Sequence, residues 1–404
     1  MGFQHGLSGL NAAARNLDVI GHNVANANTV GAKASRAEFG DVIAHAVYGI
    51  GAPFGGLGVQ VERVAQQFSQ GDLASTANPL DLAINGAGFF RLSDGGSITY
   101  SRNGQFHTDK DGYIVNSAGA RLTGYPADAN GVIQPGVPAE LRMVTGDIPP
   151  RATSSVEAVL NLDSRGEAKT ATFDLNDPTT YNSATSLRVY DAQGGDTTLA
   201  LYFRKTAPDT WEVYAGANGT QIGAGPVGQV SFLPNGKVDT ATTPMPFTIP
   251  VPNAAGGIDN VAVDMTETTQ YGSVFGVNHL SQDGFSAGRL ASYSISDEGI
   301  ITARYTNGET RAQGQIALAN FSNPEGLASL GGNVWAETAE SGVAMVGSPS
   351  SANLGVIQSG ALEQSNVDLT AELVNMITAQ RSYQANAQTI KTHDQILQTI
   401  VNLR

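Results

Sequence analysis

The two ends of this 404-residue chain carry the same hydrophobic spacing, and no other sequence feature restricts its fold as strongly. The spacing alternates between steps of four and three residues, which is the heptad pattern of a coiled-coil seam. It predicts one helix over 3–28 and a second over 366–404, about 58 Å long at the rise of an α-helix. The predicted seam residues are Phe3, Leu7, Leu10, Ala14, Leu17, Gly21 and Val24 at one end, and Leu369, Leu373, Met376, Gln380, Tyr383, Ala387, Ile390, Asp394, Leu397 and Val401 at the other. Such a chain brings its termini together and leaves apolar surface for self-assembly with further copies.

The C-terminal segment has the clearest helix signals. No Gly or Pro occurs in its 39 residues. Asn366 or Asp368 can cap it, and Glu372 places an acidic side chain in its first turn. The N-terminal helix is expected to end in the asparagine-rich stretch before Gly31.

Charge separates the two ends from the middle of the chain. The sequence has 22 basic and 36 acidic residues, a net charge of −14. Residues 1–30 and 366–404 each sum to zero, so the entire negative excess lies in 31–365. Neutral ends can pack in many copies without long-range repulsion, whereas an acidic middle argues against nucleic acid or anionic membranes as partners.

The sequence offers no constellation of residues for catalysis. It has no cysteine, which excludes disulfides, thiol chemistry and cysteine-ligated metals. The histidines lack metal-ligand spacing, and 109–112 predicts a hairpin turn because the later ligands of a calcium loop are missing. We therefore expect no enzyme activity, no cofactor and no metal, with Trp211 and Trp335 as hydrophobic anchors. We also expect neither a signal peptide nor a membrane span.

The middle of the chain predicts β structure. Two-residue turn signals such as Asn103-Gly104 recur between alternating apolar residues. One hairpin is expected around Gly194-Gly195, and part of another over 295–305. Composition changes predict an outer β domain at 147–282, inserted into an inner one formed by 76–146 and 283–360.

The remaining segments predict a connector between the helices and the β domains. Residues 31–75, with 361–365, show no clear periodicity and are expected to form an extended connector. Its flexibility is expected to come from glycines, namely Gly49, Gly51, Gly55, Gly56 and Gly58. The predicted fold is mixed α and β and multidomain. It has a terminal helical coiled-coil domain, 1–30 with 366–404, and two mainly antiparallel β domains.

Several motifs together resemble the flagellar rod and hook protein family. An asparagine-rich helix end leads to Thr29-x-Gly31-x-Lys33, and further matching motifs occupy 78–90, 101–106 and 360–404. His22 and Ala32 depart from the pattern, which would have Asn and Phe. Rod members are shorter and lack a large insertion, so the length and the predicted insertion favour the hook branch.

The resemblance implies a structural subunit that polymerises into the flagellar hook, a flexible tubular universal joint. This tube would be extracellular, would transmit motor torque to the filament, and would have the terminal helices lining its export channel. The implied partners are further copies of the chain, the hook cap, the distal rod protein, the hook–filament junction protein and the flagellar type III export apparatus. Export would need no cleaved signal peptide, and neither nucleic acid nor membrane insertion is implied.

Two questions stay open at this point. The seam helices could pair within one chain and close its own core, or they could pack between copies. The chain could also be a distal rod or other axial flagellar protein, or a secreted β-rich adhesin with a coiled-coil stalk. The adhesin would need a ligand site in 147–282, where no cluster of charged residues converges.

Overall fold

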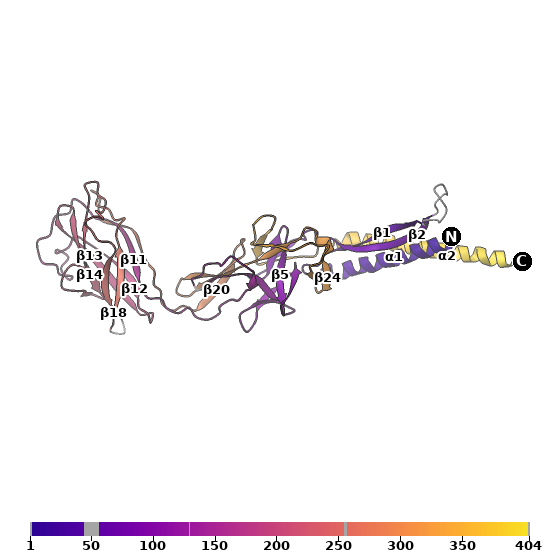
Figure 1. Cartoon of the computed structure of the whole chain (residues 1–404), viewed down its shortest axis with the longest axis horizontal. Coiled ribbons are helices and arrows are strands. Elements are labelled where there is room, and N and C mark those ends of the chain that lie inside the picture. The colour runs from indigo at the N-terminus through magenta and orange to yellow at the C-terminus, as the bar shows by residue number, and fades with distance from the viewer. Residues whose placement is uncertain (1, 44–55, 129, 254–256, 403–404) are drawn as a thin grey trace. The chain divides into compact units, whose positions relative to one another are not determined.

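The structure is a computed structural model that describes residues 2–43, 56–128, 130–253 and 257–402. Strands fill the middle of the chain and helices form its two ends (Figure 1), which confirms the predicted mixed, β-rich fold class. The chain divides into two compact units. Unit 1 comprises 1–145, 293–303 and 311–404, and unit 2 comprises 146–292 and 304–310. The finer division of unit 1 into helical domain, connector and inner β domain stays a prediction.

The two helices of unit 1 begin and end close to the predicted residues. Helix α1 spans Gly2–Ala25 and helix α2 spans Leu369–Asn402. Asp368 caps α2, because its Oδ1 accepts hydrogen bonds from the backbone N–H groups of Thr370 at 2.8 Å and Ala371 at 3.1 Å.

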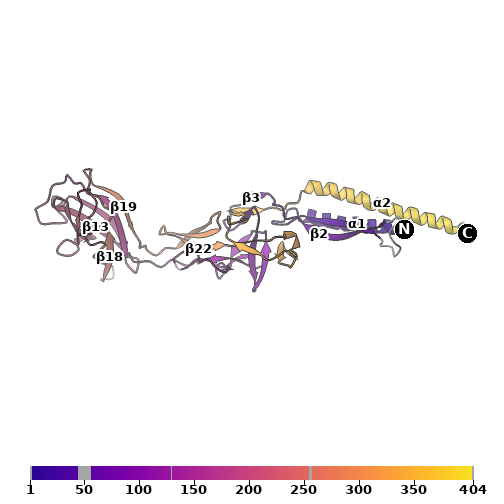
Figure 2. The ribbon, with the colours of Figure 1, turned by 45° about the horizontal axis from the view of Figure 1, so that its top comes forward.

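Much of the predicted connector is a β-hairpin, which the sequence analysis did not foresee. Strand β1 (Ser35–Ile43) pairs antiparallel with β2 (Gly56–Gln66), and both strands contact α1 (Figures 1 and 2). The register shifts at Glu38/Phe39 and at Val42/Ile43. Each bulge moves the following side chains to the other face of the ladder. The hydrophobic period of two is therefore interrupted in the sequence.

Short strands build the β part of unit 1 around one main sheet, whose order is β20-β21-β22-β9-β5-β6-β25-β24. Strands β20 to β22 carry residues of both units, and β20 with β21 forms the second predicted hairpin. Leu92 and Leu122 face each other across β5 and β9 and are fully buried. The bounds are β3 (Leu73–Ser75), β4 (Leu82–Asn85), β5 (Phe89–Asp94), β6 (Ser97–Ser101), β7 (Phe106–Thr108), β8 (Ile114–Asn116), β9 (Arg121–Pro126), β10 (Ala139–Glu140), β20 (Leu290–Ile295), β21 (Ile300–Tyr305), β22 (Thr310–Ile316), β23 (Leu318–Asn320), β24 (Ala328–Gly331), β25 (Val334–Ala336), β26 (Met345–Gly347), β27 (Val356–Ser359) and β28 (Ala361–Glu363), with a 3-10 turn at Pro324–Gly326.

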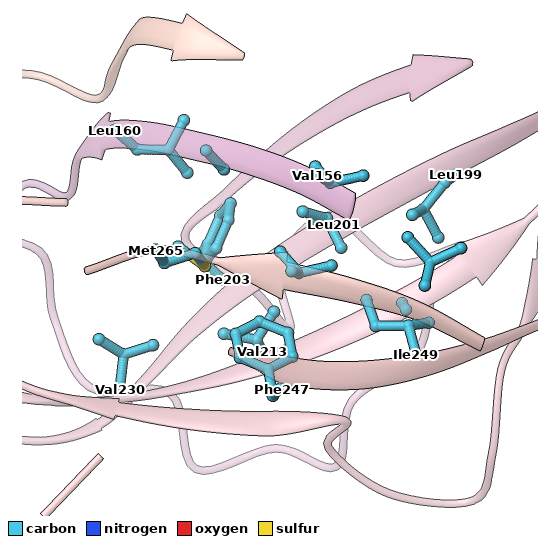
Figure 3. Packing of buried hydrophobic residues seen from close by; sticks show 14 of the residues in the cluster. Val156, Leu160, Leu199, Leu201, Phe203, Val213, Val230, Phe247, Ile249 and Met265 are labelled. Carbon is cyan, nitrogen blue, oxygen red and sulfur yellow. The ribbon is translucent and has the colours of Figure 1, made fainter. Parts of the chain in front are cut away.

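Unit 2 consists of two sheets that share one hydrophobic core. The orders are β17-β18-β11-β19 and β12-β13-β14-β15, with β16 paired to β14. The first predicted hairpin is β12 with β13, where Leu187 lies opposite Leu199. Figure 3 shows side chains of β11 and β17 pointing toward those of β13 and β14. The bounds are β11 (Ser155–Asn161), β12 (Ser183–Tyr190), β13 (Asp196–Ala207), β14 (Thr210–Ala217), β15 (Thr220–Gln221), β16 (Gly228–Ser231), β17 (Phe247–Pro252), β18 (Ile258–Asp264) and β19 (Gly276–Gln282).

Each unit contains one tryptophan, and both are buried, as the sequence interpretation expects. Trp335 and Trp211 each have only 1% of their surface exposed. Each indole N–H donates a hydrogen bond to a glutamine side chain, Trp335 to Gln66 and Trp211 to Gln270, both at 2.6 Å. The first of these bonds fastens the hairpin strand β2 to the main sheet of unit 1.

Candidate self-assembly interface

Three charged side chains meet where the chain leaves α1 and where it approaches α2. We call Lys33, Arg102 and Glu363 the junction cluster. Lys33 Nζ lies 2.6 Å from Glu363 Oε1, and Arg102 Nη1 lies 3.1 Å from Glu363 Oε2. The carboxylate of Glu363 is fully buried and also accepts a hydrogen bond from the Gly71 N–H at 3.0 Å. One side chain thus holds three segments that are far apart in sequence.

The junction cluster contains two cations and one carboxylate, so it carries a net positive charge in a buried place. Burial lowers the pKa of Lys33, and the attraction of Glu363 opposes this shift. Burial likewise lowers the pKa of Arg102, again against the attraction of Glu363. Both cations are therefore held in the interior by the same carboxylate, and its loss would leave them unpaired.

Two asparagines fasten the helices to the hairpin. Asn23 near the end of α1 exchanges two hydrogen bonds with the backbone of Ser35, at 2.7 and 2.8 Å. Asn366, just before α2, donates to the Gln67 carbonyl at 2.8 Å and accepts from the Ala34 N–H at 2.7 Å. Asn366 therefore serves as an attachment point, while the helix cap is Asp368.

These residues were not predicted from the sequence to form part of a site. Lys33, Arg102 and Glu363 all lie in motifs that carry the family resemblance, which was the one available signal. Lys33 and Glu363 are separated by 330 positions, and no spacing rule pairs residues at that distance.

The backbone conformation and close surroundings of Gly31 explain why the Thr-x-Gly-x-Lys motif has a glycine at this position. Its φ is +70°, and a Cβ there would lie 2.6 Å from the backbone N of Asn103 and 2.8 Å from the carbonyl carbon of Arg102. Its own N–H donates to the backbone oxygen of Glu363 at 2.8 Å. The close approach of two backbones beside the junction cluster requires a residue without a side chain.

We expect Gly31→Ala to lower the free energy of unfolding of unit 1 by about 3 kcal/mol or more. Alanine at a positive φ alone costs about 1–3 kcal/mol, and the new methyl group also meets immobile backbone atoms. Urea unfolding followed by Trp335 fluorescence, in a Trp211→Phe background, measures this. Gly119→Ala is the matched control, since φ is also positive at Gly119 but no atom lies near the added Cβ. Equal losses in the two variants would contradict the close-packing explanation.

The two helices contact each other through small residues of α1. An added Cβ on Gly6 would lie 2.9 Å from Ile390 Cγ1, and one on Gly9 would lie 2.8 Å from Asn386 Oδ1. A later residue of α1 lies opposite an earlier residue of α2, so the two helices run antiparallel. Figures 1 and 2 show the same arrangement, with the N-terminus beside the C-terminal half of α2.

The predicted seam of α1 lies at the edge of this contact. Ala12, Ala13 and Ile20 are buried on its inner side. Seam positions follow Ala13 and Ile20 by one or four residues, which rotates them by about 100° or 40° around the helix. Leu7 is 45% exposed, and the remaining described seam residues of α1 (Leu10, Ala14, Leu17, Gly21 and Val24) are half-buried. The contact within one chain therefore covers this apolar stripe only in part.

The seam of α2 is similarly divided. Its half-buried members are Met376, Ala387 and Ile390, while Leu369, Leu373, Gln380, Tyr383 and Asp394 are exposed. Among the α2 side chains that the structure describes, the buried one is Ala379, next to the predicted Gln380. Val374 and Ile377, at 58% and 52% exposed, widen the apolar surface beside Leu373. The side chains of Phe3, Leu397 and Val401 lie outside the described residues.

The glycines assigned to connector flexibility fall in two groups. Gly49, Gly51 and Gly55 lie outside the described residues. Gly56 and Gly58 belong to β2. Gly58 has a φ of +120°, and an added Cβ would overlap the Ser8 hydroxyl of α1, so β2 needs this glycine for its approach to the helix. A role of the whole set in flexibility stays a prediction.

Other kinds of site find little support in the described ranges. No three His, Cys, Asp or Glu side chains gather there as metal ligands. Neither described helix is long and apolar enough to cross a membrane.

Comparisons with known proteins agree along the whole chain. Family models match in four places: "Flagella basal body rod protein" at 3–33, "Flagellar hook protein FlgE/F/G D1 domain" at 83–156, "Flagellar basal body protein FlaE D2 domain" at 161–285 and "Flagellar basal body rod FlgEFG protein C-terminal" at 358–403. The flagellar hook protein FlgE of Escherichia coli (strain K12) is 42% identical, with all of both chains covered. The chain belongs to the flagellar hook protein family. Flagellar hook proteins of Salmonella typhimurium and Rhizobium meliloti are 42% and 34% identical, over 100% and 99% of this chain and 100% and 98% of their own.

A solved member supports the fold of this hook-family chain. The crystal structure of Helicobacter pylori flagellar hook protein FlgE2 has a TM-score of 0.56 at 14% identity and covers 72% of this chain and 100% of its own. At the position where the sequence departs from the expected aromatic residue, Ala32 is 3% exposed. The adjacent Lys33 and Ala34 provide the polar attachments to Glu363 and Asn366.

Proposed function

We propose that this chain is the structural subunit that polymerises into the flagellar hook, a flexible tube that transmits motor torque to the filament. The similarity to hook proteins from end to end, at 42% identity, carries the proposal. The half-covered apolar stripes on α1 and α2 support it, because exposed apolar surface on charge-neutral helices favours packing between copies over a purely internal helix pair.

The uneven charge of the chain supports a radial arrangement of the subunit in the tube. The neutral terminal helices form the inner wall around an export channel, and the acidic β structure faces outward. Close packing of many copies favours neutral surfaces, whereas mutually repelling acidic surfaces are tolerated where neighbours must slide. In this proposal the chain works as a scaffold and performs no catalysis.

The proposed partners follow from the position of a hook in the flagellum. They are further copies of the chain, the distal rod protein below, the hook–filament junction protein above, a cap at the growing end and the type III export apparatus. The hook lies outside the cell, and the subunit reaches it through the central channel without a cleaved signal peptide.

The glycine-rich segment 49–58 is proposed as a compliant strut in this joint. Replacement of Gly49, Gly51 and Gly55 by alanine restricts the backbone, so hooks of the variant are expected to bend less. Electron microscopy of isolated hooks measures their distribution of curvature. Curvature equal to that of wild-type hooks would remove the segment from the bending mechanism.

Complementation tests the proposed function directly. The gene is expressed in a flagellated bacterium that lacks its own hook protein, and purified basal bodies are imaged. Curved hooks and restored swimming are expected. Export of the protein without hooks would contradict the proposal, and straight rigid extensions would indicate a rod protein.

A further inference from the structure

Helix α2 extends beyond the end of α1, so its last turns lie past the described residues of that helix. Gly6 lies opposite Ile390, and α1 begins four residues earlier at Gly2. The pairing therefore ends near Asp394, and 395–402 continues for about 12 Å at the helical rise. Figures 1 and 2 show this overhang, with the C-terminal end of α2 projecting past the N-terminal end of α1.

The overhang 395–402 is uncharged and rich in apolar residues. Ile396, Leu397, Ile400 and Val401 alternate with glutamine, threonine and asparagine, and no acidic or basic residue occurs in the segment. Ile396 is 50% exposed. Because isolated helical turns are marginal in water, such an end gains stability when another surface covers its apolar side.

A groove lies farther along the same helix pair, toward the end of α1 and the beginning of α2. It has a volume of about 650 Å³ and is bounded by α1, the hairpin β1–β2 and α2. Small apolar side chains such as Ala13 and Ala37 line it together with the amides of Asn16 and Asn375. A cavity of about 150 Å³ already holds benzene, so this groove has room for several aliphatic side chains.

We infer that the groove of one copy receives the overhang 395–402 of a second copy. This inference rests on the proposed function and names the surfaces that join two subunits. Uncharged aliphatic and amide side chains of the overhang match a groove in which small apolar groups and amides predominate. Glu372 and Arg36 are its charged members.

The arrangement of the two features explains an open polymer. The overhang and the groove are different surfaces near opposite ends of one helix pair. A contact between different surfaces is heterologous, so every added copy presents a free overhang or a free groove to the next. The overhang cannot reach its own groove, because Thr378 in the groove and Ile396 lie 18 residues apart on one continuous helix, about 27 Å.

Disulfide trapping tests the inference. The sequence has no native cysteine, so disulfides can form only between the introduced cysteines. Thr378→Cys with Ile396→Cys is assembled into polymers, oxidised and separated on a denaturing, non-reducing gel. A ladder of covalent dimers and larger multimers is expected, because a disulfide needs Cα atoms within about 7 Å and the two positions are too far apart within one chain. Addition of a reductant is expected to remove the ladder.

The matched control places the second cysteine on another side of the same helix. Gln384 is exposed and does not line the groove. Gln384→Cys with Ile396→Cys is expected to give no ladder. Polymers without a ladder from the Thr378 pair, or an equal ladder from the control pair, would overturn the inference and leave the hook assignment intact.

A truncated chain ending at Asp394 gives a second, independent measurement. It keeps the groove but lacks the overhang, so it can join one end of a growing polymer and cannot extend it. We expect it to remain unpolymerised alone and to shorten polymers when mixed with the full-length chain. Unchanged polymer length, or normal polymers from the truncated chain, would refute the inference. Failure of the unmodified full-length chain to polymerise would instead refute the proposed function, and the inference with it.

Discussion

Replacing Glu363 by leucine is expected to destabilise unit 1 by about 3–5 kcal/mol, the usual effect of breaking a buried ion pair from one side. Lys33 and Arg102 would remain buried without their shared carboxylate. The Gly71 N–H would also lose an acceptor. Urea unfolding in a Trp211→Phe background follows unit 1 through Trp335 and measures the change in the free energy of unfolding.

Two further variants separate the charge effect from a general effect of the substitution. Glu325→Leu is the matched control, because its ion pair with Arg63 is about half exposed and an exposed pair contributes only about 0–1 kcal/mol. Replacing Lys33 and Arg102 by methionine together with Glu363→Leu removes all three charges and should recover much of the lost stability. A loss below about 1 kcal/mol for Glu363→Leu would show that the junction cluster does not hold the segments together.

Replacing Leu373 by aspartate is expected to abolish polymerisation while both units stay folded. Leu373 is 46% exposed in the single chain, so an aspartate there remains solvated and affects the monomer little. In a polymer the same carboxylate would be buried in an apolar contact without a partner, which costs several kcal/mol for every subunit. Sedimentation and electron microscopy measure assembly, and the two tryptophans report folding.

The control for this variant is Gln384→Asp, which adds the same charge at an exposed position of α2 outside the predicted seam. It should polymerise far better than Leu373→Asp. Polymers of normal length from Leu373→Asp would exclude this stretch of the seam from the assembly contact.

The elements that the sequence predicted well are those with uninterrupted local signals. Helix α2 has no Gly or Pro and begins at Leu369, directly after its cap Asp368, so the local pattern predicts its position. The hairpin β12–β13 has a Gly-Gly turn between alternating apolar residues, so period and turn chemistry agree. The borders of the predicted insertion at 147–282 depend on changes in composition and stay a prediction.

The elements that the sequence did not predict depend on long-range or irregular geometry. The bulges of β1–β2 break the period of two, so this hairpin resembles an irregular connector in sequence. The junction cluster unites residues 330 positions apart. Its lysine, arginine and glutamate are common surface residues, and only the folded backbone brings them together. The heptad pattern also could not reveal that Ala379, rather than Gln380, is buried in the single chain.

The most direct test of terminus-driven assembly is negative-stain electron microscopy of two purified chains under salting-out conditions, which strengthen apolar association. One is the full-length protein, and the other is a truncation to 31–365, checked for folded β structure through Trp211 and Trp335. We expect curved tubes from the full-length chain and none from the truncation. Equivalent tubes from the truncation would contradict assembly through the terminal helices, as would a full-length chain that stays monomeric with its helices paired internally.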